Sequence, residues 1–180
     1  MPLIITILLW IVIILSVVLV SSVLAHIWVR GVPYVPSKAR VIKEMIKLAD
    51  LKSGQTVFDL GAGDGRVLIE AKKECPGITA IGVELVPTVW LYGRLRIWLS
   101  KAKISFWWGD AFYKDLRSAD VVFLYLFPDV LKKFEKKFDK ELRPGTRVIS
   151  NAFEFKDREP VTRLKIPCGK KMRKVFVYEW

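Results

Sequence analysis

The stretch VFDLGAGDGRV, residues 57–67, constrains the fold more than any other part of the chain. An apolar run ends in Asp59 and Leu60, and glycines follow at positions 61, 63 and 65. A strand that leads through a glycine loop into a helix presents backbone N–H groups and a helix N-terminus to a ligand. In open α/β sheets such ligands bind beyond the carboxyl ends of the strands. The stretch therefore predicts a ligand site at one edge of a sheet.

The spacing of the glycines narrows the class of ligand. A P-loop requires GxxxxGK(S/T), and the sequence contains no such run, so nucleoside triphosphate hydrolysis is excluded. The dinucleotide fingerprint GxGxxG would need a third glycine at position 66, which is Arg66. The spacing is GxGxG instead, and the ends of other strands have to identify the ligand.

Apolar runs and helical patterns alternate along the rest of the chain. This alternation predicts an α/β fold with a parallel sheet and helices on both faces. We expect helices within 38–51, 66–74, 87–102 and 129–142, and strands within 56–60, 79–85, 104–110, 119–127 and 143–150. Two further strands, within 161–167 and 174–180, are expected to close the sheet as an antiparallel pair. Ser37 is expected to be the N-cap of the first of these helices.

The N-terminus is a separate feature, because residues 1–29 contain no Asp, Glu, Lys or Arg. The apolar run exceeds the roughly 20 residues that a helix needs to span a bilayer. A cleaved signal peptide is disfavoured because a basic n-region is missing and because the run exceeds the roughly 7–15 residues of an h-region. We therefore expect a retained transmembrane anchor at 1–29, a linker with two prolines at 30–37, and a folded domain at 38–180.

The basic residues all follow the apolar run, and the whole formal charge of +12 lies in residues 30–180. The positive-inside rule places the domain on the cytoplasmic side of a bacterial or archaeal plasma membrane, or on the matrix side of a mitochondrial inner membrane. Attraction to an anionic lipid surface is the favoured explanation of the charge. A solvated surface comes second and nucleic acid third. With one histidine and two separated cysteines, no metal site is expected.

Acidic residues end the second and third strands. Glu84 lies 25 residues beyond Asp59, where an acid pairs with ribose hydroxyls in related sheets. Asp110, in the sequence GDA, can accept a hydrogen bond from an adenine amino group. A glycine loop and three acids at successive strand ends form a more specific pattern than any single motif. Asp64, within the loop, is expected either to cap the following helix or to contact the ligand.

The motifs DLGAGDGR, GVEL and GDAF at this spacing resemble class I S-adenosylmethionine-dependent methyltransferases over roughly residues 38–180. The resemblance implies a Rossmann-like methyltransferase sheet and S-adenosylmethionine as cofactor. It implies that Glu84 binds the ribose hydroxyls and that Asp110 binds the adenine. The cofactor-binding residues implied in these motifs are Asp59, Gly61, Ala62, Gly63, Glu84, Leu85, Asp110 and Ala111.

A narrower resemblance includes PYVPS, before the first helix, and VWLYGRLRIW, after the second strand. Behind an N-terminal membrane span, these segments are similar to the membrane-anchored lysine methyltransferases that act on the c-subunit of ATP synthase and on the adenine nucleotide translocase. The resemblance implies methylation of a lysine on a membrane protein, with Tyr34 and Ser37 closing over the cofactor. That family usually has Thr where this chain has Ser37, which keeps the hydroxyl.

The exit of the fourth strand, YLFPD, is the expected substrate pocket. It lacks the Asn-Pro-Pro-aromatic motif of amide and nucleobase amino methyltransferases. A lysine nucleophile must be neutral although its reference pKa is about 10.4, and an apolar pocket lowers that pKa. Tyr125 and Phe127 are candidates for such a pocket. Asp129 is a candidate to accept a proton or orient the amine, with an N-cap role as the alternative.

Two alternative functions remain open from the sequence. The first is methyl transfer to a lipid, a quinone or another small molecule, and the second is a membrane adaptor without catalysis. The intact acids at 59, 84 and 110 count against the adaptor. Four tryptophans are expected to be packing residues, with a membrane-facing or substrate-facing patch as the minority interpretation: Trp90, Trp98, Trp107 and Trp108.

Overall fold

The computed structural model describes residues 2–30, 34–169 and 171–180, and the chain separates into two compact units, 1–33 and 34–180. The first unit contains helix α1 (Pro2–Arg30). Its segment Leu3–Ser21 has a mean hydropathy of 3.4 and is long and apolar enough to cross a membrane. Every side chain of this segment is exposed. Residues 31–33 of the predicted linker lie outside the described residues.

The second unit is built on a mixed sheet, which confirms the predicted α/β class. The described strands form one sheet in the order β3-β2-β1-β4-β5-β7-β6. The first five strands in this order are parallel, and β7 pairs antiparallel with both β5 and β6. The strands are β1 (Thr56–Leu60), β2 (Thr79–Glu84), β3 (Ile104–Trp108), β4 (Val121–Leu124), β5 (Arg147–Asn151), β6 (Thr162–Cys168) and β7 (Lys171–Glu179).

Two apolar clusters hold helices against the sheet. In one, Ile42 and Met45 of α2 and Leu68 of α3 pack against β1, β4 and β5. In the other, residues of α5 such as Leu131 and Phe138 pack against side chains of the same strands that point the opposite way. The helices of this unit are α2 (Ala39–Ala49), α3 (Arg66–Glu74), α4 (Pro87–Ser100) and α5 (Pro128–Glu141), with a 3-10 turn η1 at Ala111–Tyr113.

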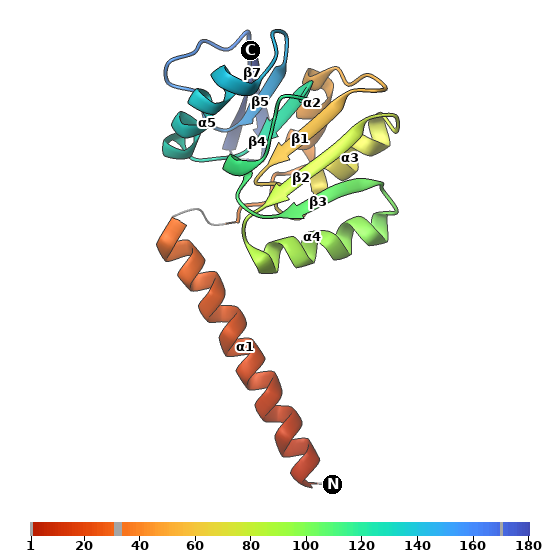
Figure 1. The fold of residues 1–180 in the computed structure, drawn as a ribbon, viewed down its shortest axis with the longest axis vertical. Coiled ribbons are helices and arrows are strands. Elements are labelled where there is room, and N and C mark those ends of the chain that lie inside the picture. Colours follow the sequence, from red (N-terminus) through yellow and green to blue (C-terminus); the bar gives the residue numbers. More distant parts are fainter. Residues whose placement is uncertain (1, 31–33, 170) are drawn as a thin grey trace. The chain divides into compact units, whose positions relative to one another are not determined.

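Helix α4 runs alongside the edge strand β3 (Figure 1). Its buried residues are Gly93 and Ile97, and Phe106 of β3 packs with Ile97. A Cβ at Gly93 would lie 2.9 Å from the carbonyl oxygen of Gly63, so α4 approaches the glycine loop closely. This close approach explains a glycine inside a helix, where it costs stability relative to Ala.

Two local predictions were wrong. Helix α2 has Lys38, not Ser37, at its N-cap position, because the Ser37 hydroxyl is engaged by Asn151 at the end of β5. Trp98 and Trp108 do not pack inside the domain: they are 73% and 62% exposed, and Trp107 is exposed as well. The reason is that Trp98 lies on the outer side of α4, while Trp107 and Trp108 lie on an edge strand.

Candidate functional site

The carboxyl ends of the parallel strands bring the predicted residues to one edge of the sheet. Leu60, the last residue of β1, pairs with Val83 of β2 and with Leu124 of β4. Glu84, the last residue of β2, pairs with Trp108 of β3. The glycine loop, Glu84 and the segments that follow β3 and β4 therefore begin at the same edge.

The glycine loop folds back over the end of β2. The N–H groups of Gly61 and Ala62 both donate to the carbonyl oxygen of Val83, each at 3.0 Å. Gly63 has a φ of 57°, in the left-handed region that strains a residue with a side chain. A Cβ at this position would lie 2.8 Å from Cε2 of Tyr34. Both the backbone conformation and the available space thus require glycine at position 63.

Glu84 fixes the shape of this loop. Its side chain is buried, its Oε2 accepts a hydrogen bond from the N–H of Gly63, and its Oε1 accepts one from the N–H of Val86, each at 2.8 Å. The carboxylate thereby ties the loop to the start of α4. Since each carboxylate oxygen has two lone pairs, Glu84 can also accept a hydrogen bond from a hydroxyl of a ligand.

Asp59 is a buried carboxyl directly before the loop. Burial raises its pKa to about 8, and the negative charges of Glu84 and Asp64 add to this effect. Asp59 is therefore mainly protonated at neutral pH when no cation lies beside it. A cation that binds next to Asp59 would favour the ionised carboxylate and lower its pKa again.

Asp64 is the centre of an ion-pair cluster that links three elements. Its side chain is 1% exposed and forms ion pairs with Arg66 of α3, at 2.8 Å, and with Arg96 of α4. Burial by itself would raise the pKa of Asp64, but the hydrogen bonds and charge of Arg66 and the charge of Arg96 hold it below its usual value. Asp64 also accepts a hydrogen bond from the backbone N–H of Arg66 at 3.3 Å. The N-cap of α3 is Gly65, so the predicted capping role of Asp64 was wrong, and its contact with a ligand stays a prediction.

Tyr34 and Ser37 lie against this cluster, in the segment before α2. Burial, together with the charge of Asp64, raises the pKa of the Tyr34 hydroxyl to about 12, although the charge of Arg66 opposes this rise. The Ser37 carbonyl oxygen accepts a hydrogen bond from Nη1 of Arg66 at 3.0 Å. The Ser37 hydroxyl accepts one from Nδ2 of Asn151 at 2.9 Å. The segment is therefore held next to the glycine loop, where the resemblance expects a cover over the cofactor.

The segments after β2 and β3 are held by local hydrogen bonds. The side chain of Asp110 accepts a hydrogen bond from the N–H of Phe112 at 2.9 Å and so caps η1, which begins at Ala111. The carbonyl oxygen of Leu85 accepts one from the indole N–H of Trp108 at 3.2 Å. These bonds position the backbone on both sides of the place predicted for the adenine.

Tyr125 and Phe127, after β4, form an aromatic cluster with Phe153, after β5. The ring centroids of Tyr125 and Phe127 lie 6.2 Å and 5.4 Å from that of Phe153. Leu126, between the two, places its Cδ2 3.1 Å from where a Cβ of Gly61 would be. The aromatic cluster therefore adjoins the glycine loop, on the side of β4.

Asp129 is exposed in the first turn of α5 and is not its N-cap, so the predicted N-cap role was wrong. Pro128 is the first residue of the helix, and Phe127 is the N-cap. A proline suits the first helical position because a backbone N–H at that position would have no hydrogen-bond partner within the helix. The helix consequently begins one residue before Asp129, whose role toward a substrate stays a prediction.

Sequence reasoning missed three residues that the fold brings to this site: Arg96, Asn151 and Phe153. Asn151 contacts Ser37 across 114 residues of chain, a pairing that no local pattern indicates. Phe153 is positioned by a tight turn in which the Ser150 hydroxyl donates to its carbonyl oxygen at 2.6 Å. Of these three, only Arg96 could have been found from the sequence. An acid in the glycine loop needs a cationic partner if it is buried, and Arg96 is one of the few basic residues in the helix that follows the second strand.

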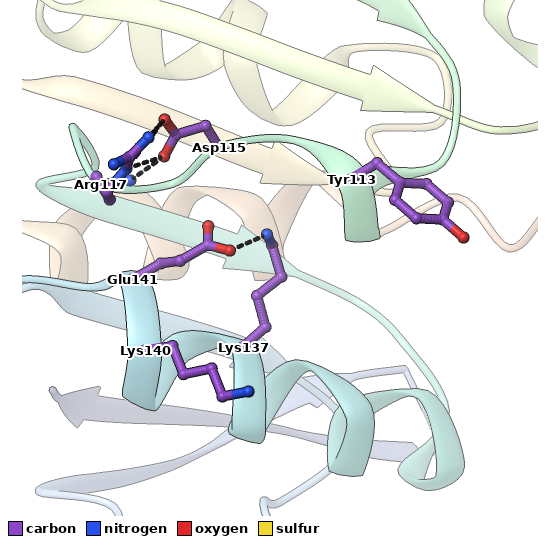
Figure 2. Close-up of a pocket in the computed structure, with 6 residues that line it drawn as sticks. All are labelled: Tyr113, Asp115, Arg117, Lys137, Lys140 and Glu141. Atoms are coloured by element: carbon purple, nitrogen blue, oxygen red, sulfur yellow. Dashed lines mark hydrogen bonds and ion pairs between the residues drawn. The ribbon is translucent and has the colours of Figure 1, made fainter.

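A separate polar pocket of about 360 Å³ lies between α5 and the segment after η1 (Figure 2). It is lined by Tyr113, Asp115, Arg117, Lys137, Lys140 and Glu141, none of which is a predicted site residue. Arg117 pairs with Asp115 at 2.7 Å, and Lys137 pairs with Glu141. Since most of its charges neutralise one another, we assign this pocket no part in the site. Among the described residues, no group of three His, Cys, Asp or Glu side chains is placed to hold a metal ion.

Comparison with known proteins identifies relatives of the chain. Residues 59–162 match a family described as the ANTKMT methyltransferase domain. A protein-lysine N-methyltransferase of Saccharolobus islandicus (strain REY15A) is 34% identical over 158 residues, which cover 84% of this chain and 95% of that protein. The human lysine N-methyltransferase of the ATP synthase c-subunit is 33% identical over 68% of this chain, and the mouse adenine nucleotide translocase lysine N-methyltransferase is 37% identical over 72%. The matches cover 52% and 57% of those two proteins, about half of their length.

Solved structures with the same fold include an RNA methyltransferase from Salinibacter ruber in complex with S-adenosyl-L-homocysteine. It is 30% identical, with a TM-score of 0.73, and the match covers 81% of this chain and 93% of that one. TrmN from Thermus thermophilus has a TM-score of 0.66 at 20% identity, over 77% of this chain and 48% of that one, and shows the fold alone.

Proposed function

Since the chain belongs to the ANTKMT methyltransferase family and is an S-adenosylmethionine-dependent protein-lysine N-methyltransferase, we propose that it methylates a lysine of an integral membrane protein while anchored by α1. One combination carries this proposal: the family match at 59–162 occurs in the same chain as the apolar segment Leu3–Ser21. Relatives named for the ATP synthase c-subunit and for the adenine nucleotide translocase support a membrane-protein acceptor.

The residues at the carboxyl edge suit S-adenosylmethionine. Gly61 and Gly63 have positive φ angles of 75° and 57°, which let the backbone of the loop turn close to a ligand, and Glu84 has lone pairs for ribose hydroxyls. Asp59 would supply a carboxylate to the cationic cofactor. We assign the cofactor to these residues and to Tyr34, Ser37, Ala62, Leu85, Asp110 and Ala111.

The bound cofactor supplies an electrophilic methyl group, and the chain's own residues have to deliver a neutral amine to it. Transfer forms an N–C bond and breaks the S–C bond, so the lysine must first lose a proton to solvent or to a base. The aromatic cluster of Tyr125, Phe127 and Phe153 provides apolar surroundings that lower a lysine pKa. We propose these rings as walls of the lysine channel and Asp129 as a group that orients the amine.

The charge of the chain supports a cytoplasmic or matrix location for the domain. Residues 1–29 carry no charged side chain, and the net charge of +12 follows them. We propose 1–29 as the anchor, 30–37 as the linker and 38–180 as the catalytic domain, attracted to an anionic lipid surface. Anchoring raises the effective concentration of the enzyme for acceptors in the same membrane.

The test is transfer of label from radiolabelled S-adenosylmethionine by the full chain in membranes of a host that lacks the enzyme. Proteins, organic-soluble molecules and RNA are separated after the reaction, and an Asp59→Ala variant is the control. We expect label in a discrete protein band, located on lysine by mass spectrometry. Label only in the organic extract would replace the proposal with a lipid or quinone acceptor, and label only in RNA would replace it with an RNA acceptor. Cofactor binding with no label in any fraction would favour an adaptor.

A further inference from the structure

Helix α4 exposes a continuous apolar face. Five of its large side chains are between 52% and 73% exposed: Leu91, Tyr92, Leu95, Trp98 and Leu99. At 3.6 residues per turn these positions fall within an arc of about 120° on the outer side of the helix. Single exposed apolar residues are common, but a contiguous patch on a soluble domain marks an interaction surface.

The opposite side of α4 already makes its contacts with the domain. Gly93 and Ile97 are buried, and they face Phe106 of the edge strand β3. The five exposed residues therefore do not belong to the core, and no described element of the domain covers them. Something outside the domain has to account for this face.

The surroundings of the face are basic. Residues 85–109 contain four Lys and Arg residues and no Asp or Glu. Arg94 and Arg96 lie on opposite flanks of the apolar arc by helical spacing, and the side chain of Arg96, which also pairs with Asp64, is 40% exposed. The Cζ of Arg94 lies 5.4 Å from the centroid of the Trp90 ring. The ring centroids of Trp90 and Trp108 lie 6.4 Å apart, and exposed Trp108 extends the aromatic surface beyond the helix. An apolar face with Trp and Tyr and with basic flanks is typical of helices that lie in the interface of an anionic bilayer.

The chain itself keeps the domain close to a bilayer if α1 spans one. Only residues 31–33 separate α1 from Tyr34, so the connection reaches at most about 14 Å, whatever its conformation. A domain on so short a connection stays close to the membrane surface. The face on α4 suits that place because it is apolar in the middle and cationic at its sides.

We propose that the outer face of α4, comprising Leu91, Tyr92, Leu95, Trp98 and Leu99, docks on an anionic lipid surface. The proposal rests on the membrane anchoring of the proposed function but not on the identity of the methyl acceptor. Docking through α4 also orients the site, because the inner side of this helix meets the glycine loop where Gly93 approaches the carbonyl oxygen of Gly63. The carboxyl edge of the sheet is then held at a constant distance from the membrane.

The experiment uses the full chain, one copy per nanodisc, with a photoactivatable phosphatidylglycerol among the lipids. After illumination, lipid adducts are mapped by mass spectrometry, and no substitution is needed for this first step. We expect adducts in α1 and on residues 91–99, and none around Met172, which is 57% exposed on β7. In discs of phosphatidylcholine that contain only a phosphatidylcholine probe, we expect about tenfold fewer α4 adducts, because one or two basic residues lose their anionic partners.

A variant with Leu95→Glu and Leu99→Glu tests the same face, and Met172→Glu is the matched control. All three side chains are exposed, so the substitutions leave the core intact, which near-UV circular dichroism verifies. The double variant should lose the α4 adducts and keep those in α1, whereas the control should keep both. Adducts confined to α1 in the unaltered chain would overturn docking through α4. Adducts missing from α1 would overturn the anchor, and the docking proposal with it.

Discussion

The raised pKa of Asp59 leads to a prediction about stability. Asp59 is buried, and its pKa of about 8 in the folded domain compares with an ordinary value of 3.8. Between these two values the folded chain binds a proton that the unfolded chain has released. The free energy of unfolding must therefore fall as the pH rises through this window. Replacing Asp59 by Asn removes the titrating group and should remove this part of the pH dependence.

The size of the effect follows from the shift in pKa. Each pKa unit corresponds to about 1.4 kcal/mol, so between about pH 5 and about pH 8 the parent should lose roughly 4 kcal/mol relative to Asp59→Asn. Asp50→Asn is the matched control, because Asp50 is an exposed carboxylate that pairs with Lys52 at 3.6 Å on the surface of the domain.

The assay is urea unfolding of the full chain in detergent micelles, followed by tryptophan fluorescence at a series of pH values. As the pH rises, the free energy of unfolding of Asp59→Asn should increase relative to that of the parent. The free energy of unfolding of Asp50→Asn should change with pH as that of the parent does. S-adenosylmethionine should reduce this loss of stability with rising pH in the parent, because its sulfonium favours ionised Asp59. Calorimetry near neutral pH should then detect proton release on cofactor binding to the parent and less release for Asp59→Asn.

Parallel stability curves for Asp59→Asn and the parent over this range would refute the reasoning. They would mean that Asp59 ionises normally in the folded domain, so that water or an unrecognised cation solvates it. Unchanged cofactor affinity in Asp59→Asn would separately remove Asp59 from the cofactor site.

Three further substitutions test the site. Gly63→Ala should weaken S-adenosylmethionine binding about tenfold in calorimetry, because the left-handed backbone costs about 1 kcal/mol and the added Cβ contacts Tyr34; an unchanged affinity would contradict the place of the glycine loop in the cofactor site. Glu84→Gln places an amide group against a backbone N–H and should raise the dissociation constant about tenfold or more; an unchanged constant would contradict the assignment. Asp64→Asn should lower the free energy of unfolding by about 2 kcal/mol in urea, since it leaves two partly exposed arginines without their shared carboxylate, and equal stability would contradict a structural role for the cluster.

Local patterns were sufficient for the elements and for the carboxyl edge. Residues 56–60 form a strand and 66–74 form a helix within the predicted ranges, because a short apolar run and a helical repeat each depend on neighbours in sequence. Glu84 lies at the sheet edge with Asp59 because parallel strands place their carboxyl ends together. The cofactor class followed from the same motifs.

Contacts between distant segments could not be predicted in this way. Ser37 is of a residue type that is common at N-caps, yet its hydroxyl accepts a hydrogen bond from Asn151. Trp98 is a large apolar residue of the kind expected in a core, yet it is exposed on the outer side of α4. In both cases the surroundings of the side chain depend on how helices and strands pack, and not on the residues next to it in sequence.

The sequence by itself determined that this chain has an apolar N-terminal helix, a parallel sheet and a glycine loop with acids at successive strand ends. These features arise from local hydrophobic periodicity and from backbone conformations that only glycine adopts easily. The tertiary structure alone decided that Asp64 joins Arg66 and Arg96, that Phe153 completes an aromatic cluster, and that α4 keeps an apolar face outside the core. Burial and ion pairing are properties of the assembled fold, because the surfaces and charges that meet there come from segments far apart in the chain.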